Sequence, residues 1–534
     1  MIINHVGFDK IRQFSKRDKD YQLNPEVFKD FISYPPDEDG LLMAVEDRKN
    51  FPVNRKILVD VISAQYAKIE KSILQSKNIE SLLSEDVFTV ITAHQPSLFT
   101  GPFYYITKIV SAITLANDLS LKAGKKIIPI FINGSEDHDF DEINHLTIFG
   151  KKVVWENNED GPVGRKTIEG LVQSFEAFKS ILGQSDKAEH IINIFNDSIQ
   201  NVNSYNEFVF QFLNRLFGHK GLIVVNTDDK SLKKLFIPVI SKELLERRSQ
   251  SIVQQAQNKL EAIGYKPQAF ARDINLFYIE KGLRERIVFE NGIYSVINTD
   301  LQWREDEILK LLDENPEKFS PNVVLRPVYQ ELIFPNIAYI GGGGELAYWQ
   351  ERKDLMKYFE VFMPVLLRRN STMFFLKPQL KTIEKLGMEW QDFLNDLHQI
   401  NQNYLLSISN IELELTMEKR QIIEVFNEII TKAINIDKGL KDGIEVERTK
   451  TIKQIEQIEA RLVKSIKRNE ETALNQIATV YHKIFPDGGL QERVDNFFQY
   501  HLVLGDNLLE DLYQHLNPLN KDVVVIIEEI LMQD

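Results

Sequence analysis

The chain has 534 residues, of which 43% are apolar and 27% are charged. It has 78 acidic and 64 basic side chains, which gives a formal net charge of −14. This length corresponds to roughly three to four average domains and excludes a small domain that depends on cross-links for its stability. The negative charge opposes a phosphate backbone and excludes a dedicated nucleic-acid binder, and the absence of cysteine excludes disulfides, thiolate metal ligands and a cysteine nucleophile.

Residues 1–85 predict an N-terminal extension that packs on the core. A loop is expected around Pro35–Gly40, where two prolines precede an acidic turn and a glycine. A charged helical pattern then runs through Leu58, Ile62, Tyr66 and Ile69.

Residues 86–376 predict an α/β core. The segment 88–91 is a short β-branched strand, 103–119 has helical spacing, and 126–132 is a second buried strand. Strand, helix and strand in this order form a βαβ unit, so a parallel sheet is expected. Further strands are expected at 152–155, 221–226 and within 277–297, with helices between them. This pattern favours a mixed sheet with inserted segments, followed by loops and apolar segments at 321–370.

Residues 377–485 predict an antiparallel helical coiled-coil arm. The segment is poor in glycine and proline, and its apolar residues recur at steps of three and four, as at Ile422, Val425, Ile429, Ala433 and Ile436. Gly439 and Gly443 mark the expected reversal. The pattern fits an arm that packs on its own chain and equally one that pairs two copies. Residues 486–534 predict C-terminal helices that return to the core.

The first polar cluster lies at the turn between the strand at 88–91 and the following helix. Free backbone N–H groups and the positive end of a helix dipole meet at such a turn and favour an anionic ligand. A polar turn that merely opens a helix is the alternative. The candidate ligand-binding residues are His94, Gln95, Thr100, Gly101, Tyr104 and Lys108.

The second cluster directly follows the strand at 126–132. Five carboxylates and two histidines lie within ten residues, and such like-charge repulsion is tolerated mostly where the charges are needed. Three roles are open: a metal held by His138, Asp139 and Asp141, a general base, or capture of an ammonium group. The alternative is an exposed turn in which Asp137 or Asp139 caps the next helix. The candidate residues are Glu136, Asp137, His138, Asp139 and Asn144.

The third cluster surrounds four consecutive glycines, Gly341–Gly344, that follow an apolar strand. Glycines at this point let the backbone approach a ligand closely, and a mobile loop is the alternative. Arg326 and the pair Arg368–Arg369 are candidate forks for a carboxylate or a phosphate. The candidate residues of this cluster are Arg326, Gln330, Glu331, Gly342, Gly343, Glu345 and Tyr348.

Several familiar motifs are missing from the sequence. It contains no P-loop, Rossmann GxGxxG fingerprint, HExxH, nucleophile elbow or kinase set, so no motif names a cofactor or a resident metal. The N-terminal sequence MIINHVGFDKIRQF does not read as a signal peptide, and no apolar stretch approaches the roughly 20 residues of a membrane helix. We therefore expect a soluble, cytoplasmic protein without a membrane partner.

Taken together and in this order, the clusters resemble the BshC family, the cysteine ligases of bacillithiol biosynthesis. The resemblance covers about residues 88–494 and rests on the stretches TAHQPSLFTGPFYYITKI, IPIFINGSEDHDFDEINH, GPVGR, LRPVYQELIFPNIAYIGGGGELAYW and PDGGLQERV. It implies a Rossmann-like, nucleotidyltransferase-type core with connecting-peptide insertions, related to class I aminoacyl-tRNA synthetases. It also implies a coiled-coil arm that pairs two subunits, and an enzyme that adds cysteine to glucosaminyl malate to give bacillithiol.

The implied reaction constrains the chemistry. Joining a carboxylate to an amine in water is uphill, so cysteine must arrive activated or be activated by ATP or another nucleotide. Our hypothesis assigns an anion, either malate or a phosphate, to His94, Lys108 and the helix start after Gly101. It assigns amine binding and general-base work to Asp137, His138 and Asp139, with Arg326, Gln330 and Glu345 orienting the second substrate. A transferase of other specificity on the same core and a non-catalytic scaffold are the alternatives.

Overall fold

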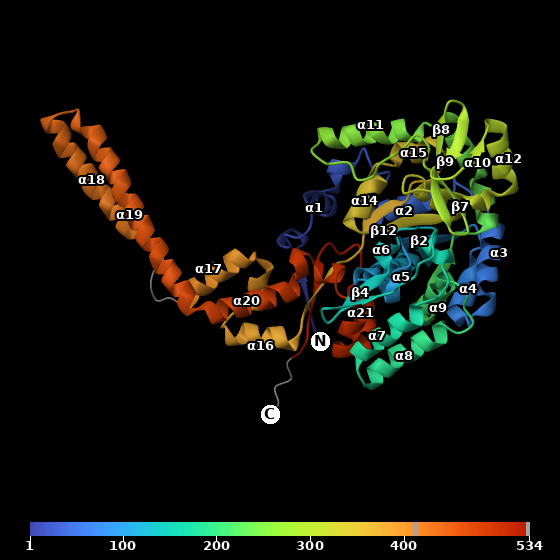
Figure 1. The fold of residues 1–534 in the computed structure, drawn as a ribbon, viewed down its shortest axis with the longest axis horizontal. Coiled ribbons are helices and arrows are strands. Elements are labelled where there is room, and N and C mark those ends of the chain that lie inside the picture. The colour runs from blue at the N-terminus through green and yellow to red at the C-terminus, as the bar shows by residue number, and fades with distance from the viewer. Residues whose placement is uncertain (409–414, 530–534) are drawn as a thin grey trace. The chain divides into compact units, whose positions relative to one another are not determined.

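The computed structural model describes residues 1–408 and 415–529 and divides into two compact units (Figure 1). The first unit comprises Met1–Met373 and Leu490–Ile527. The second begins at Phe374, ends at Gly489, and also takes the residues from Glu528 onward. Residues 409–414 of the predicted arm and 530–534 of the predicted C-terminal segment lie outside the described residues.

A five-stranded parallel sheet forms the centre of the first unit. Its strand order is β13-β12-β2-β3-β6, and each neighbouring pair runs parallel. The strands are β2 (Val87–His94), β3 (Lys126–Asn133), β6 (Ile223–Asn226), β12 (Asn336–Gly341) and β13 (Val365–Arg368). Nearly every residue of these strands is buried, as expected where helices cover both faces of a parallel sheet. Helix α5 (Tyr104–Ala123) joins β2 to β3, which confirms the predicted βαβ unit.

The prediction of one mixed sheet is wrong, because the antiparallel strands form sheets of their own. One has the order β10-β9-β8-β7-β11, and its neighbours all run antiparallel. Its strands are β7 (Leu276–Glu280), β8 (Leu283–Glu290), β9 (Ile293–Val296), β10 (Gln302–Trp303) and β11 (Phe319–Pro321). A separate hairpin joins β4 (His145–Ile148) to β5 (Lys151–Val154). The segment expected to hold loops at 321–370 instead carries two central strands and the helices around them.

The N-terminal segment adds four helices and one strand to the first unit. The helices are α1 (Lys16–Leu23), α2 (Glu38–Arg48), α3 (Arg55–Gln65) and α4 (Ile73–Ser81). The helix predicted through Ile69 ends earlier, since one 3-10 turn follows α3 and Ile69 is extended. Strand β1 (Ile2–Val6) was not predicted, and it pairs antiparallel with β15 (Val523–Ile527) from the other end of the chain.

The remaining helices of the first unit surround the sheets. They are α6 (Phe140–Ile143), α7 (Leu171–Leu182), α8 (Asp186–Ser198), α9 (Tyr205–Phe217), α10 (Lys230–Glu246), α11 (Ser249–Ala262), α12 (Glu305–Glu314), α13 (Arg326–Ile333), α14 (Gly343–Gln350), α15 (Lys353–Tyr358), α21 (Phe497–Leu504) and α22 (Asn507–His515). None of the described helices of the chain is long and apolar enough to cross a membrane.

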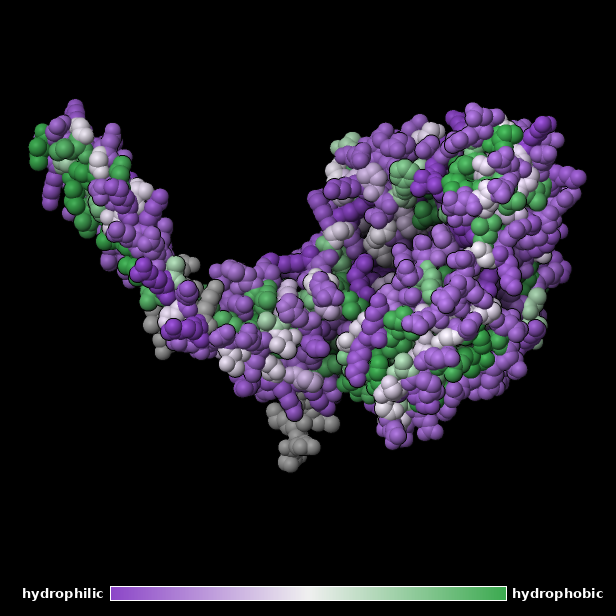
Figure 2. All heavy atoms as spheres, in the orientation of Figure 1, coloured by the Kyte–Doolittle hydropathy of each residue, from purple (hydrophilic) through white to green (hydrophobic). Residues whose placement is uncertain are grey.

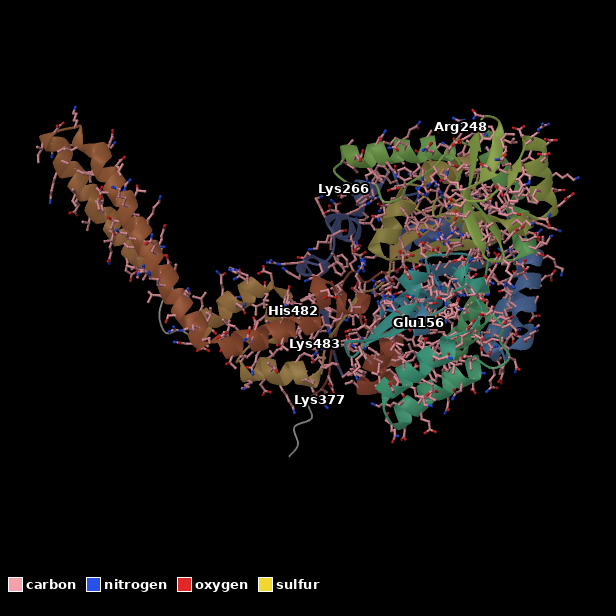
Figure 3. All side chains as sticks on the ribbon, viewed as in Figure 1. Glu156, Arg248, Lys266, Lys377, His482 and Lys483 are labelled. Carbon is pink, nitrogen blue, oxygen red and sulfur yellow. The ribbon has the colours of Figure 1, made fainter. Side chains whose placement is uncertain are left out.

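The second unit is mainly helical and begins within strand β14 (Thr372–Phe375). Its helices are α16 (Lys377–Lys385), α17 (Leu397–Ile408), α18 (Thr416–Ile436), α19 (Leu440–Asn469) and α20 (Glu471–Ile484). Lys377 begins α16, and His482 and Lys483 lie in the last turn of α20, where basic side chains complement the helix dipole (Figure 3).

Helices α18 and α19 form the predicted antiparallel hairpin. Lys419 pairs with Glu459 at 2.9 Å, and Arg448 donates to Asn427 at 3.0 Å, so the contacts move toward the turn along both helices. The chain reverses at Asp437–Gly439. Gly443, the second expected marker of the reversal, lies inside α19.

Candidate active site

A cavity of about 470 Å³ opens beyond the carboxyl ends of β2, β3, β6 and β12. Ligands of open parallel sheets bind at this edge, where polar loop residues follow the buried strands. The cavity brings together residues from all three predicted clusters. Those that line it are His94, Gln95, Tyr104, Glu136, Asp137, Arg326, Gln330, Gly342, Glu345 and Tyr348.

The other candidates lie outside this lining, namely Thr100, Gly101, Lys108, His138, Asp139, Asn144, Glu331 and Gly343. The turn at Thr100 and Gly101 does not face the cavity as expected. Thr100 is buried, and the Asn496 amide donates to the Gly101 carbonyl at 2.7 Å. Lys108 and Glu331 are buried behind the wall, and His138 lines a neighbouring cavity.

Glu345, whose side chain is 27% exposed at the cavity wall, forms an ion pair with the buried Lys108. Lys108 is 1% exposed, and its Nζ donates to the Ala93 carbonyl at 2.6 Å and to Glu345 Oε1 at 2.8 Å. The Gly342 N–H donates to Glu345 Oε2 at 2.8 Å. Burial alone would raise the pKa of Glu345, but the Lys108 ammonium and this N–H lower it to about 2. Glu345 is therefore a permanent anion facing the cavity.

His94 is neutral at physiological pH, and its tautomer follows from its contacts. Burial, followed by the nearby Lys108 charge, lowers the pKa of His94 to about 4. Its Nδ1 lies 3.0 Å from the Gln95 carbonyl, which can only accept, so Nδ1 carries the proton. The Tyr104 hydroxyl then donates to Nε2 at 3.1 Å. His94 therefore serves as a hydrogen-bonding group rather than a cation.

Asp137 is the central carboxylate of the second cluster. Its Oδ2 accepts from the Gln95 amide at 2.8 Å, and its Oδ1 accepts from the His138 N–H at 2.7 Å. Burial would raise the pKa of Asp137, but Arg284, 3.8 Å away, and these hydrogen bonds lower it below the ordinary value. Asp137 is therefore ionised at the cavity wall and suited to bind an ammonium group.

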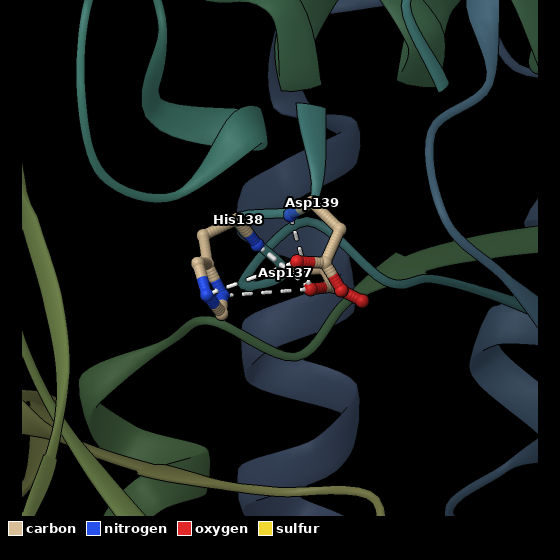
Figure 4. Close-up of side chains that lie close together, drawn as sticks. All are labelled: Asp137, His138 and Asp139. Carbon is tan, nitrogen blue, oxygen red and sulfur yellow. Dashed lines mark hydrogen bonds and ion pairs between the residues drawn. The ribbon is translucent and has the colours of Figure 1, made fainter. Parts of the chain in front are cut away.

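Arg284 determines which ring nitrogen of His138 accepts a hydrogen bond. Its Nη1 lies 2.6 Å from His138 Nδ1, and a guanidinium group can only donate. Nδ1 therefore accepts, and the ring proton lies on Nε2, which faces Asp139 Oδ1 at 3.8 Å (Figure 4). In this state neither ring nitrogen of His138 is free to act as the predicted general base.

The side chains of Asp137, His138 and Asp139 also lie close enough to hold a metal ion, with candidate ligand atoms within 4.8 Å of one another (Figure 4). The donor set that the sequence suggested included Asp141, which is not part of this group. Arg284 already contacts His138 Nδ1 and lies 3.8 Å from Asp137, so a metal ion here would compete with a guanidinium group for two of its three ligands.

The loop that carries Asp137 is supported by the GPVGR segment, Gly161–Arg165. Val163 N–H donates to the Asp137 carbonyl at 2.6 Å, and Gly164 N–H donates to the Ser135 carbonyl at 2.8 Å. A Cβ at Gly164 would lie 2.3 Å from that of Ser135, so only glycine fits this approach. The segment thereby fixes the backbone that presents Asp137.

Guanidinium groups balance the carboxylates of the cavity. Arg326 donates to the Tyr348 hydroxyl at 2.9 Å, and Arg369 pairs with Glu492 at 2.9 Å. Arg493 is exposed at the lining and forms no ion pair within the described chain. Arg368, the other half of the predicted fork, points elsewhere and binds Asp18 at 2.8 Å.

Several lining residues were not predicted from the sequence: Ser135, Thr227, Arg284, Asn322, Tyr329 and Arg493. Arg284 lies in an alternating charged strand that is typical of a solvated face. Lys233, buried in α10, was also missed, although it pairs with Glu136 at the lining and donates to the Phe319 carbonyl at 2.7 Å. The only sequence signal for its burial was that Lys233 is flanked by apolar residues at helical spacing.

Glu331 yields a pH-dependent prediction. Burial raises its pKa from 4.5 to about 7. The unfolded chain ionises this group at lower pH than the folded one, so stability is lost as pH rises from about 4.5 through 7. Glu331→Gln should therefore increase the free energy of unfolding at pH 8 by up to roughly 3 kcal/mol and change it little at pH 4. Urea unfolding at both pH values tests this, with Glu46→Gln, an exposed carboxylate, as control; equal effects at both pH values would contradict it.

Comparisons with known proteins cover nearly the whole chain. Two family models match: "Bacillithiol biosynthesis BshC, N-terminal Rossmann-like domain" over residues 1–370 and "Bacillithiol biosynthesis BshC, C-terminal coiled-coil domain" over residues 373–528. A protein of Flavobacterium psychrophilum named "Putative cysteine ligase BshC" is 39% identical over 518 residues, 96% of this chain and 97% of the relative. Relatives with the same name from Flavobacterium johnsoniae and Bacillus cereus are 36% and 26% identical, covering 98% and 90% of this chain and 99% and 92% of their own lengths.

Proposed function

The chain belongs to the BshC family of bacillithiol biosynthesis, and on this premise we propose that it is a ligase that joins cysteine to glucosaminyl malate through an amide bond. The observation that carries the proposal is the charge pattern of the cavity. Arg326, Arg369 and Arg493 suit the two carboxylates of a malate group, and Glu136 and Asp137 suit the amine of a glucosamine. Both substrates are small molecules, and we place the reaction in the cytoplasm.

The sheet order supports a separation of these two roles. Arg369 follows β13 and Asp137 follows β3, with β12 and β2 between them. A substrate with carboxylates at one end and an amine at the other can therefore span the cavity. The bound ammonium group would first lose a proton to Asp137, because an ammonium nitrogen has no lone pair. The free amine would then attack the acyl carbon of an activated cysteine, and the bond to the activating group would break. The departing group would take the second nitrogen proton.

Reconstitution with purified protein tests the proposal. The protein is mixed with glucosaminyl malate and cysteine, with and without ATP and Mg²⁺, and bacillithiol is detected by mass spectrometry. Product that requires ATP would identify the nucleotide as the activating cofactor, and product without it would identify an activated precursor. No product, together with ATP–pyrophosphate exchange driven by another amino acid, would instead indicate a transferase of other specificity.

We further propose that the protein is a homodimer formed through the hairpin of α18 and α19. Ile430 and Ala433 are buried within the hairpin, whereas Val425, Ile429 and Ile436 remain exposed along the same helix. Figure 2 shows apolar surface along this hairpin among its charged residues. Apolar side chains spaced by four and seven residues form a seam that a second copy can cover.

The double substitution Val425→Lys and Ile429→Lys should therefore convert the dimer to a monomer, because it buries two charges in the seam. Light scattering coupled to size-exclusion chromatography measures the molar mass. Glu428→Lys, at an exposed polar position of the same helix, is the control and should leave the dimer intact. A wild-type monomer, or a doubly substituted protein that stays dimeric, would contradict this assembly.

A further inference from the structure

A second cavity, of about 490 Å³, adjoins the candidate active site. It lies between the loop 157–161 and the turn that joins β7 to β8, and Arg284 lines both cavities. Gly161 holds loop and turn together: its φ is +89°, and a Cβ there would lie 2.9 Å from the Gly282 carbonyl carbon. Close contact between the backbones of Gly161 and Gly282 therefore fixes the two walls of the second cavity relative to each other.

A buried cation that forms no close ion pair with a described residue faces this second cavity, and the carboxylates of Glu159 and Asp160 act on it only from a longer distance. Lys166 is 4% exposed, and its Nζ forms no hydrogen bond or ion pair with any described residue. It lies 4.7 Å from the centroid of the Phe140 ring, a contact that offsets only part of its lost hydration. The buried Nε of Arg284 also has no hydrogen-bond partner within the described chain. One buried donor without a partner and one buried ammonium group without a close ion pair lie on this wall, and both suit an anionic ligand.

Carboxylates line the more exposed part of the same cavity. Glu159 accepts hydrogen bonds from the backbone N–H and the hydroxyl of Thr167, at 2.6 and 3.1 Å. Asp160 is exposed and forms no ion pair within the described residues. These carboxylates repel a polyanion such as a nucleotide, but they attract an ammonium group. A buried cation and an exposed carboxylate together complement a zwitterion.

We propose that the second cavity binds a free α-amino acid, with its carboxylate on Lys166 and its ammonium group on Asp160. The proposal rests on the proposed function for the identity of that amino acid, which is cysteine. Since Arg284 lines both cavities, cysteine in the second cavity lies beside the one in which the amino sugar binds.

Binding of three related thiols to the full chain tests this assignment by calorimetry or ligand-observed NMR. L-cysteine has both charged groups, 3-mercaptopropionate lacks the amine, and cysteamine lacks the carboxylate. Lys166→Met should weaken cysteine and 3-mercaptopropionate at least about tenfold and leave cysteamine unchanged. Lys166→Arg, which keeps the charge, should retain binding. Lys151→Met, at an exposed lysine of β5, is the matched control.

Three results would overturn the proposal: no binding of cysteine to the wild-type protein, cysteine binding that Lys166→Met leaves unchanged, or equal loss of all three thiols. These measurements need no turnover, so they fail independently of the proposed function. Cysteine binding that depends on Lys166 without bacillithiol formation would refute the function alone. Bacillithiol formation without that dependence would refute this site alone.

Discussion

Asp137→Asn is expected to lower kcat/KM for bacillithiol formation by about 100-fold or more, the usual scale for loss of a group that accepts a proton in the transition state. The asparagine keeps the shape of the side chain, but its single oxygen can accept only one of the two hydrogen bonds that the aspartate oxygens accept from Gln95 and from the His138 N–H. It removes the negative charge that holds the amine and the oxygen that takes its proton. The effect should therefore appear in kcat as well as in KM.

The control for this substitution is Glu156→Gln, which makes the same carboxylate-to-amide change at an exposed side chain (Figure 3). It should leave kcat/KM within about twofold of the wild-type value, because exposed charges away from a site contribute little. Circular dichroism and urea unfolding show whether each variant is folded. A folded Asp137→Asn protein with wild-type kcat/KM would remove Asp137 from the reaction.

Glu345→Gln is expected to lower the free energy of unfolding by about 3–5 kcal/mol, since it leaves the Lys108 ammonium buried without its counter-ion. Lys108 is 1% exposed, and no other carboxylate forms an ion pair with it within the described chain. Adding Lys108→Met to Glu345→Gln should recover a large part of the loss, because the second change removes the stranded charge. Chemical denaturation of the four proteins of this double-mutant cycle measures the coupling.

Acid should have the same effect as Glu345→Gln. The folded-state pKa of Glu345, about 2, lies below its ordinary value of 4.5, so its contribution to stability is fully present above pH 4.5 and is lost as pH falls through 2. The matched control is Asp60→Asn, which breaks an exposed pair with Lys56 and should cost less than about 1 kcal/mol. Equal losses for Glu345→Gln and Asp60→Asn would contradict the pairing of Glu345 with the buried Lys108.

The elements of the fold that the sequence predicts well are those with local signals. Strands β2 and β3 are continuous apolar runs, and α5 lies between them with helical spacing, so the unit can be identified without knowledge of its neighbours. Strand β1 cannot be identified in this way, because its partner β15 lies more than 500 residues further along the chain. The separation of the β7–β11 strands from the central sheet was equally hidden, because it depends on which strands pair.

The residues of the candidate site likewise divide into those that a local sequence pattern predicts and those that depend on long-range contacts. Asp137 and Glu345 follow buried strands, and that position alone predicts the cavity edge. Thr100 occupies a similar turn but is buried, and Asn496, from the far end of the chain, donates to the carbonyls of its neighbours Phe99 and Gly101. Arg284 reaches Asp137 only because the inserted antiparallel sheet folds back over the edge. Residues that a long-range contact brings to a site, or removes from it, carry no local sequence signal.

Thiol profiling tests the central claim most directly. The gene is expressed in a host that makes glucosaminyl malate but lacks its own cysteine-adding ligase, and cellular thiols are measured by mass spectrometry with and without the gene. We expect bacillithiol to appear with the wild-type gene and to be absent or strongly reduced with the gene encoding Asp137→Asn. Unreacted glucosaminyl malate in cells that contain folded wild-type protein would contradict the account.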